Sequence, residues 1–157
     1  MKKIITLEQS QDIIKRFKNE AKTIVLAGGC FDILHLGHLK FLEAGKSQGD
    51  ILIVALESDE NVKRLKGQGR PINQQILRAE NLNRTGLVDY VLLLPDMRSD
   101  TDYLRLVKAL SPDVIAVTAG DPQFKNKQKG AKIVGAQVKI VIHHLSGFST
   151  SQILNNL

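Results

Sequence analysis

The sequence is poor in cysteine and aromatic residues, and it has no long apolar run. A single cysteine, Cys30, excludes an internal disulfide and predicts a reducing compartment, the cytoplasm. Tryptophan is absent and aromatic residues make up 4% of the chain, so a stacking platform for single-stranded nucleic acid is not expected. No apolar run approaches the roughly 18 residues of a membrane span, and residues 1–8 lack the apolar core of a secretory signal. We therefore predict a cytoplasmic protein with neither a membrane nor a nucleic-acid partner.

What the sequence does contain is typical of one globular domain that binds an anion. The chain has 157 residues, of which 43% are hydrophobic and 24% charged, enough to bury a sizeable core. The formal net charge of +6 favours an anionic ligand, such as a phosphorylated small molecule. Lysines at 125, 127, 129 and 132 keep nucleic acid as an alternative partner, although a solvated face is the simpler interpretation.

Apolar runs alternate with helical patterns, which predicts an α/β fold. Five buried strands are expected, at residues 23–27, 51–56, 90–94, 114–118 and 138–142. We predict a single Rossmann-like domain over residues 1–157, with an N-terminal helix within 1–20 and a core over 23–157. The mostly parallel sheet has the expected order 3-2-1-4-5, with helices on both faces. Its ligand site is expected where the order reverses, at loops 28–38 and 118–124.

The stretch after the first strand combines glycines with two histidines. Gly28 and Gly29 allow a close backbone turn, and Gly37 opens a helix whose N-terminus attracts anions. His35 and His38 are three residues apart around that turn, so both imidazoles can face one phosphate group. The sequence has neither a Walker A loop nor Gly-x-Gly-x-x-Gly, and its histidines and cysteine lack zinc-site spacing. Two surface histidines at a helix start are the simpler alternative.

Residues 29–38 resemble the His-x-Gly-His motif of the cytidylyltransferase-like nucleotidyltransferase superfamily. Further runs resemble the adenylyltransferase domain of ADP-heptose synthases, at 49–55, 64–67, 69–73, 78–80, 88–91 and 147–151. The resemblance implies transfer of a nucleotidyl group from ATP or CTP to the phosphate of a small acceptor, with release of pyrophosphate. A sugar phosphate such as heptose 1-phosphate is the favoured acceptor. Mg²⁺ is expected to enter with the triphosphate, and a homodimer is expected.

The resemblance also implies roles for individual residues. It implies catalytic roles for His35, His38 and Lys46, although a helix lysine is otherwise most often a solvated surface residue. The residues that it implies for nucleotide binding are Gly29, Cys30, Phe31, Asp32, Gly37, Arg78, Gly120, Asp121, Ser149, Thr150 and Ser151. No side chain is assigned to a metal.

Two departures from the family patterns leave alternatives open. Residues 118–121 read Thr-Ala-Gly-Asp where heptose-type enzymes have Lys-Gly-Gly-Asp, and residues 144–150 lack the Arg-Thr-x-Gly-Ile-Ser-Thr run of glycerol-phosphate enzymes. An alcohol-phosphate cytidylyltransferase, for example one that uses glycerol 3-phosphate, is therefore an alternative. A nucleotide-binding module without catalysis is an alternative of another class.

Overall fold

The structure is a computed structural model, and it describes residues 3–143. Its strands are β1 (Ile4–Thr6), β2 (Ile24–Gly29), β3 (Ile51–Leu56), β4 (Tyr90–Leu93), β5 (Val114–Thr118) and β6 (Gln137–Ile142). Its helices are α1 (Leu7–Asn19), α2 (Leu36–Lys46), α3 (Asp59–Lys66), α4 (Gln75–Arg84), α5 (Asp100–Leu110) and α6 (Phe124–Val134). No helix in residues 3–143 is long and apolar enough to cross a membrane.

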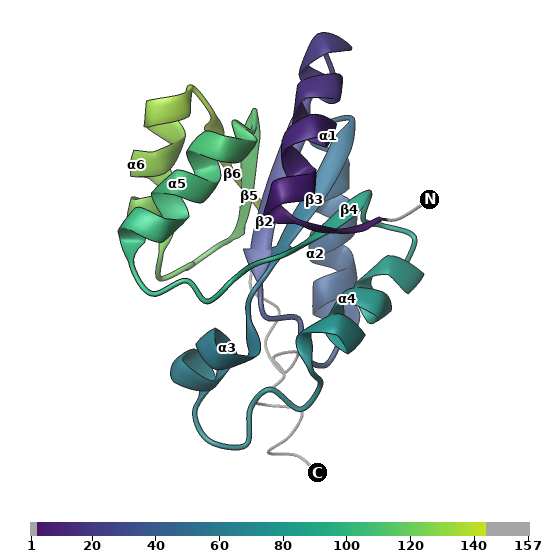
Figure 1. The fold of residues 1–157 in the computed structure, drawn as a ribbon, viewed down its shortest axis with the longest axis vertical. Helices are drawn as coiled ribbons and strands as arrows, with labels where there is room; N and C mark the ends of the chain where they lie inside the picture. The colour runs from purple at the N-terminus through teal and green to yellow at the C-terminus, as the bar shows by residue number, and fades with distance from the viewer. Residues whose placement is uncertain (1–2, 144–157) are drawn as a thin grey trace.

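The strands form one parallel sheet in the order β1-β4-β3-β2-β5-β6, with helices on both faces (Figure 1). Alternate residues of β2 point to opposite faces of the sheet. On one face, Val25 packs in a core with Phe41 of α2 and Leu82 of α4. On the other face, Leu26 packs in a core with side chains of α1 and α5. The central strands are therefore buried on both sides, as their continuous apolar runs predict.

The predicted α/β class is confirmed, and so is the order of the five predicted strands. These strands are β4-β3-β2-β5-β6 in the structure, which corresponds to the expected 3-2-1-4-5. The number of strands is corrected to six, because residues 4–6 form β1 and pair with β4 at the sheet edge. The predicted N-terminal helix accordingly begins at Leu7, with Thr6 as its cap in a capping box with Gln9. A three-residue strand that pairs with a distant segment has no local sequence signal.

The chain reverses direction across the sheet at β2. From β2 the chain moves to β3 on one side, and β5 lies on the other side. Connections that leave in opposite directions open a crevice at the carboxyl ends of the two strands. The loops that follow β2 and β5 therefore form the walls of the expected site.

Candidate active site

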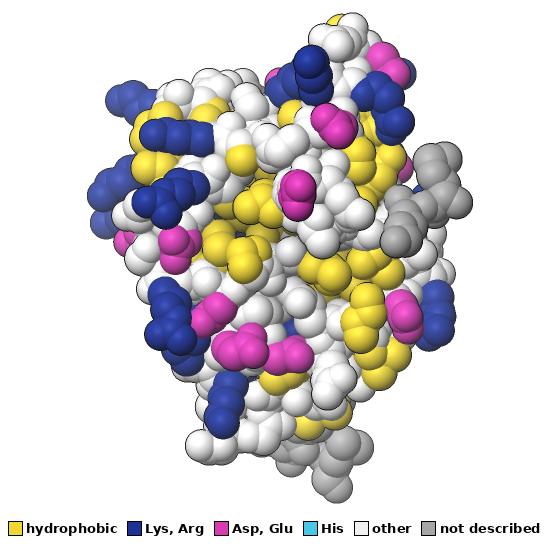
Figure 2. All heavy atoms as spheres, in the orientation of Figure 1, with side chains coloured by type: hydrophobic (Ala, Val, Ile, Leu, Met, Phe, Trp, Pro, Cys, Tyr) yellow, Lys and Arg dark blue, Asp and Glu magenta, His cyan; other side chains and the backbone are white. Residues whose placement is uncertain are grey.

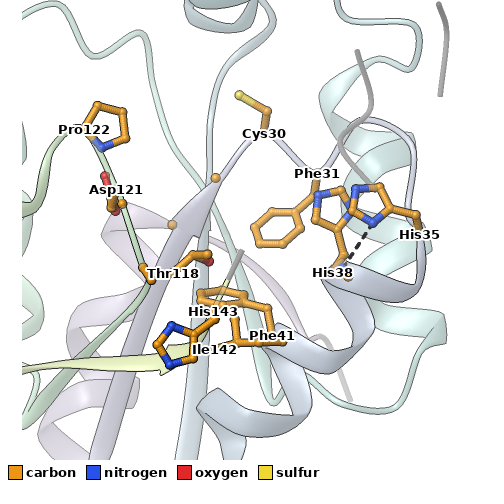
Figure 3. A pocket seen from close by; sticks show the side chains of 15 residues that line it. Cys30, Phe31, His35, His38, Phe41, Thr118, Asp121, Pro122, Ile142 and His143 are labelled. Carbon is orange, nitrogen blue, oxygen red and sulfur yellow. Dashed lines mark hydrogen bonds between the residues drawn. The ribbon is translucent and has the colours of Figure 1, made fainter. Parts of the chain in front are cut away.

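A cavity of about 460 Å³ lies at the carboxyl ends of β2, β5 and β6 (Figure 3). Its walls come from the loop after β2, the start of α2, the loop after β5 and the end of β6. The lining residues are Gly28, Gly29, Cys30, Phe31, His35, Gly37, His38, Phe41, Thr118, Ala119, Gly120, Asp121, Pro122, Ile142 and His143. The two loops that the sequence selects for the ligand therefore meet in one cavity.

The two histidines of the motif lie face to face at the start of α2. His35 is the N-cap, and its Nδ1 atom accepts a hydrogen bond of 3.4 Å from the backbone N–H of His38. A neutral imidazole that accepts at Nδ1 carries its proton on Nε2. The rings stack with centroids 3.7 Å apart and planes at 20°. The N-cap position of His35 and the stacking contact thus hold the two rings together at the start of α2.

The environment of His38 disfavours a positive charge on the free protein. Burial, followed by the nearby His35, lowers the pKa of His38 to about 4, although a hydrogen bond with the Ile33 backbone opposes this. Burial also lowers the pKa of His35. The Nδ1 atom of His38 is buried, and residues 3–143 provide no hydrogen-bond partner for it. Both rings are therefore neutral at pH 7, and His38 keeps one buried polar atom without a partner among the described residues.

The backbone needs a glycine at the end of β2 and is strained two residues later. A Cβ atom on Gly29 would lie 2.8 Å from the ring of Phe31, so any larger residue would push that ring away. Phe31 has a φ of 45°, a rare conformation for a residue with a Cβ atom. Its ring lies 5.1 Å from the ring of His38, centroid to centroid. This turn therefore sets the wall against which His38 packs.

The opposite wall is the loop after β5, which contains an ion pair at its rim. Asp121 accepts a hydrogen bond of 2.8 Å from the backbone N–H of Gln123 through Oδ1. Its Oδ2 atom lies 2.5 Å from the Nζ atom of Lys127, in the first turns of α6. Figure 3 shows Thr118 and Asp121 across the cavity from His35 and His38.

A second polar cluster lies beside the site, at the carboxyl end of β3. The buried carboxylate of Glu57 accepts hydrogen bonds from the Tyr103 hydroxyl at 2.7 and 2.9 Å and from the Asn61 amide. Burial raises the pKa of Glu57 and the pKa of the Cys30 thiol. Cys30 therefore remains a protonated thiol at pH 7 and lines the cavity without nucleophilic character.

Asp32 does not lie at the cavity, where the resemblance implies that it binds the nucleotide. Its side chain is fully buried and lies outside the cavity lining. It accepts hydrogen bonds from Arg70 Nε at 3.0 Å and from the backbone N–H groups of Ile72 and Asn73 at 2.7 and 2.9 Å. Asp32 therefore ties the segment before α4 to the loop after β2, and the prediction that it contacts the nucleotide is corrected.

The prediction that Arg78 binds the nucleotide meets the same difficulty, because the guanidinium of Arg78 is fully buried. It donates hydrogen bonds of 2.7 to 2.9 Å to the backbone carbonyls of Cys30, Glu57 and Asn73, and one of 2.7 Å to the carboxylate of Asp59. The three carbonyls belong to three loops at the carboxyl edge of the sheet, and Asp59 is the first residue of α3. Arg78 therefore holds these segments together, and its guanidinium is not part of the cavity lining.

Lys46 lies far from the histidines. It is the last residue of α2, eight residues after His38, which is about 12 Å along a helix. Its Nζ atom lies 2.6 Å from Asp89 Oδ2 and 2.5 Å from the backbone carbonyl of Asp50, at the amino edge of the sheet. The prediction that Lys46 joins the site is corrected, since the helix carries it to the opposite edge.

The remaining predicted residues divide into two groups. The structure brings six of them together around the cavity, namely Gly29, Cys30, Phe31, Gly37, Gly120 and Asp121. Ser149, Thr150 and Ser151 lie outside the residues that the structure describes. Sequence reasoning missed Phe41, Ile142 and His143, which also line the cavity. His143 directly follows the predicted last strand, so its place at a carboxyl end was the available signal.

Within residues 3–143, no three His, Cys, Asp or Glu side chains converge in a way that could hold a metal ion. The expectation that Mg²⁺ enters with the nucleotide stays a prediction.

Comparison with known proteins identifies the family. A family model described as cytidylyltransferase-like matches residues 26–156. The chain is 41% identical over 150 residues to the bifunctional protein HldE of a Nitratiruptor species and 40% identical over 159 residues to that of Wolinella succinogenes. These matches cover 96% and 99% of this chain but 31% of each relative. The chain thus spans about a third of the length of the curated relatives that it matches.

Solved structures share the fold. A lipopolysaccharide core biosynthesis protein from Thermoplasma volcanium GSS1 superposes with a TM-score of 0.62 at 28% identity, over 79% of this chain and 97% of that one. A pantoate-beta-alanine ligase from Francisella tularensis superposes with a TM-score of 0.70 at 16% identity, over 98% of this chain and 72% of that one, which shows the fold alone. Since the family model spans most of the sequence and includes both histidines, this chain belongs to the cytidylyltransferase-like family of nucleotidyltransferases.

Proposed function

We propose that this protein transfers a nucleotidyl group from ATP or CTP to the phosphate of a small sugar phosphate, such as heptose 1-phosphate. An oxygen of the acceptor phosphate forms a bond to the α-phosphorus, and the bond from that phosphorus to the bridging oxygen breaks. The electron pair leaves with pyrophosphate. The observation that carries this proposal is the stacked pair His35 and His38, which lines the cavity at the N-terminus of α2.

The two imidazoles would stabilise the charge that develops during transfer. His35 carries its proton on Nε2 and can donate it in a hydrogen bond to a phosphate oxygen. His38 has its Nδ1 atom buried at the cavity wall. An approaching polyphosphate raises the pKa of both rings, so a proton taken up there would offset the charge of the leaving group. The N-terminus of α2 adds its dipole in the same direction.

The acceptor class is supported by the relatives and by the sequence pattern. Proteins named HldE are 40 to 41% identical to this chain over nearly its whole length. The runs at 64–67 and 69–73 resemble ADP-heptose synthases, and Asp32 holds the second of them against the loop after β2. Thr118 lines the cavity in place of the lysine of heptose-type enzymes, which favours testing other acceptors as well.

Mg²⁺ is proposed to enter with the nucleotide. It would neutralise part of the triphosphate charge, and no protein ligand is assigned to it. A homodimer and a cytoplasmic location also stay predictions. Light scattering on the purified protein tests the homodimer, which would give the mass of two chains.

A pyrophosphate-release screen tests the proposal. ATP, CTP, GTP and UTP are each combined with Mg²⁺ and with a panel of phosphates that includes heptose 1-phosphate, other aldose 1-phosphates and glycerol 3-phosphate. We expect release of pyrophosphate with one nucleotide and a sugar 1-phosphate. Release with glycerol 3-phosphate alone would replace the sugar phosphate by an alcohol phosphate. Calorimetric binding of a nucleotide without release for any pair would contradict catalysis and indicate a nucleotide-binding module.

A further inference from the structure

The cavity has little positive charge for a ligand as anionic as a nucleoside triphosphate. Its 15 lining residues include no lysine or arginine, and one of them, Asp121, carries a carboxylate. Low pKa values keep His35 and His38 neutral at pH 7 in the free protein. The end of β5 adds no cation, because Thr118 is neutral. In the part of the chain that the structure describes, further positive charge must therefore come from just outside the lining.

One lysine of α6 reaches that lining. Helix α6 carries Lys125, Lys127, Lys129 and Lys132, and Figure 2 shows Lys and Arg side chains gathered on the side of the molecule formed by α5 and α6. The Nζ atom of Lys127 lies 2.5 Å from Asp121 Oδ2, and its side chain is 33% exposed. Lys125 and Lys129 are exposed on the same helix. Lys127 therefore stands at the cavity rim and keeps access to solvent.

The charge of Lys127 acts on groups that follow two different strands, β5 and β3. Lys127 contacts Asp121, which follows β5. Burial raises the pKa of Glu57, which follows β3, and the charge of Lys127 acts against that rise. Strand β2 lies between β5 and β3 in the sheet. The ammonium group therefore acts at the carboxyl edge of the sheet, where residues 28–30 at the end of β2 line the cavity.

We propose that Lys127 binds the polyphosphate of the nucleotide, and that Asp121 holds its ammonium group at the rim until the nucleotide arrives. This inference rests on the proposed function. A polyphosphate offers more negative charge than one carboxylate, so the ammonium exchanges one partner for a stronger one. Asp121 keeps its second hydrogen bond, from the Gln123 N–H to Oδ1, and remains anchored when Lys127 leaves.

The alternative is that the ion pair only clamps the loop after β5 to α6. The two roles predict opposite effects of neutralising Asp121 on the affinity for an anion. If Asp121 competes with phosphate for Lys127, neutralising Asp121 frees the ammonium and strengthens anion binding. If the pair is a clamp, loss of either partner loosens the loop and weakens binding alike.

Calorimetric titration with inorganic tripolyphosphate at fixed low salt separates these roles. Lys127→Met should weaken binding about tenfold or more, as expected for loss of a charge-assisted hydrogen bond. Asp121→Asn, which keeps an oxygen for the Gln123 N–H, should bind at least as tightly as wild type. Lys129→Met is the matched control, because it removes the same charge from the same helix, and it should change affinity less than about twofold. Lys127→Arg should retain most of the affinity.

Several results would overturn the inference. They are equal affinity of Lys127→Met and Lys129→Met, parallel weakening by Lys127→Met and Asp121→Asn, or no binding of tripolyphosphate to wild type. Thermal unfolding of each variant shows whether it is folded, and Lys127→Gln serves if Lys127→Met is not. The probe contains no nucleoside and undergoes no transfer. A negative result in the tripolyphosphate titration therefore does not contradict the proposed transfer reaction. A negative result in the pyrophosphate-release screen does not contradict the anion site at Lys127.

Discussion

Two lysine–aspartate ion pairs lie at opposite edges of the same sheet and have different surroundings. At the amino edge, Lys46 lies 2.6 Å from Asp89, and at the carboxyl edge Lys127 lies 2.5 Å from Asp121. Asp89 Oδ2 also accepts the backbone N–H of Leu52 at 2.7 Å, and Lys46 also donates to a backbone carbonyl. Asp121 instead lines the cavity across from the histidines.

Charged side chains have different roles at the two edges of the sheet. At the amino edge, Asp50, Asp89 and Asp113 each accept a backbone N–H at the start of a neighbouring strand or just before it, at 2.7 to 2.8 Å. These charges complete the hydrogen bonding of the sheet. At the carboxyl edge, His38 lines the cavity, and its buried Nδ1 has no partner in residues 3–143. The pair of Lys46 with Asp89 thus has a structural role, whereas the pair of Lys127 with Asp121 lies where a ligand can bind.

Arg78 should give the largest effect on stability, because it is a carboxyl-edge residue with a structural role. Arg78→Met leaves three backbone carbonyls without their donor, which should cost about 3 kcal/mol of unfolding free energy at roughly 1 kcal/mol each. Urea unfolding followed by circular dichroism measures this loss. Arg78→Lys should fall between wild type and Arg78→Met. An unchanged urea midpoint for Arg78→Met would show that the loops do not depend on this residue.

The next effect in size is the acid sensitivity of the carboxyl edge. His38 has a pKa of about 4 in the folded chain and an ordinary value of 6.5 in the unfolded chain. Between these values the unfolded chain binds the proton, so the contribution of His38 is complete above pH 6.5 and is lost as pH falls toward 4. The loss should be roughly 2 to 3 kcal/mol.

Urea unfolding of wild type and His38→Gln at several pH values isolates that loss. Glutamine does not titrate, so the stability difference between the two proteins should change between pH 6.5 and 4 and stay constant above pH 7. Parallel curves over this range would contradict a buried, neutral His38.

Lys46 should give the smallest effect. Its side chain is 39% exposed and that of Asp89 is 30% exposed, so solvent screens the pair. Lys46→Met should cost about 0.5 to 1 kcal/mol of unfolding free energy. Asp89 keeps the Leu52 N–H, which limits the loss. A loss above roughly 2 kcal/mol in urea unfolding would mean that this pair is far stronger than an exposed one.

Sequence reasoning succeeded where the signal was local. Continuous apolar runs predicted five of the strands, and their alternation with helical patterns predicted a Rossmann-like order. The His-x-Gly-His spacing placed two rings at one helix start. It failed for residues whose role depends on distant partners. Arg78 and Asp32 are polar residues in a motif, but their burial depends on loops up to 48 residues away in sequence.

The prediction for Lys46 failed for a different reason. The presence of Lys46 on the same helix as His38 suggested proximity, but a parallel sheet with crossover helices places the two ends of α2 at opposite edges. Strand β1 was missed because three residues carry no periodicity and pair only with β4. The geometry of the cavity, including His143 and the ion pair of Asp121 with Lys127, depends on how separate loops meet.

The central claim is that chemistry takes place at the carboxyl edge, and one side-by-side measurement tests it directly. Pyrophosphate release is measured for wild type, His38→Ala and Lys46→Met with the nucleotide and acceptor found in the screen. His38→Ala should lower kcat about 100-fold or more, as expected when a group that stabilises the transition state is removed. Lys46→Met should retain at least about a third of wild-type kcat, because it changes a screened pair at the other edge. Equal losses in the two variants, or full activity of His38→Ala, would contradict the account.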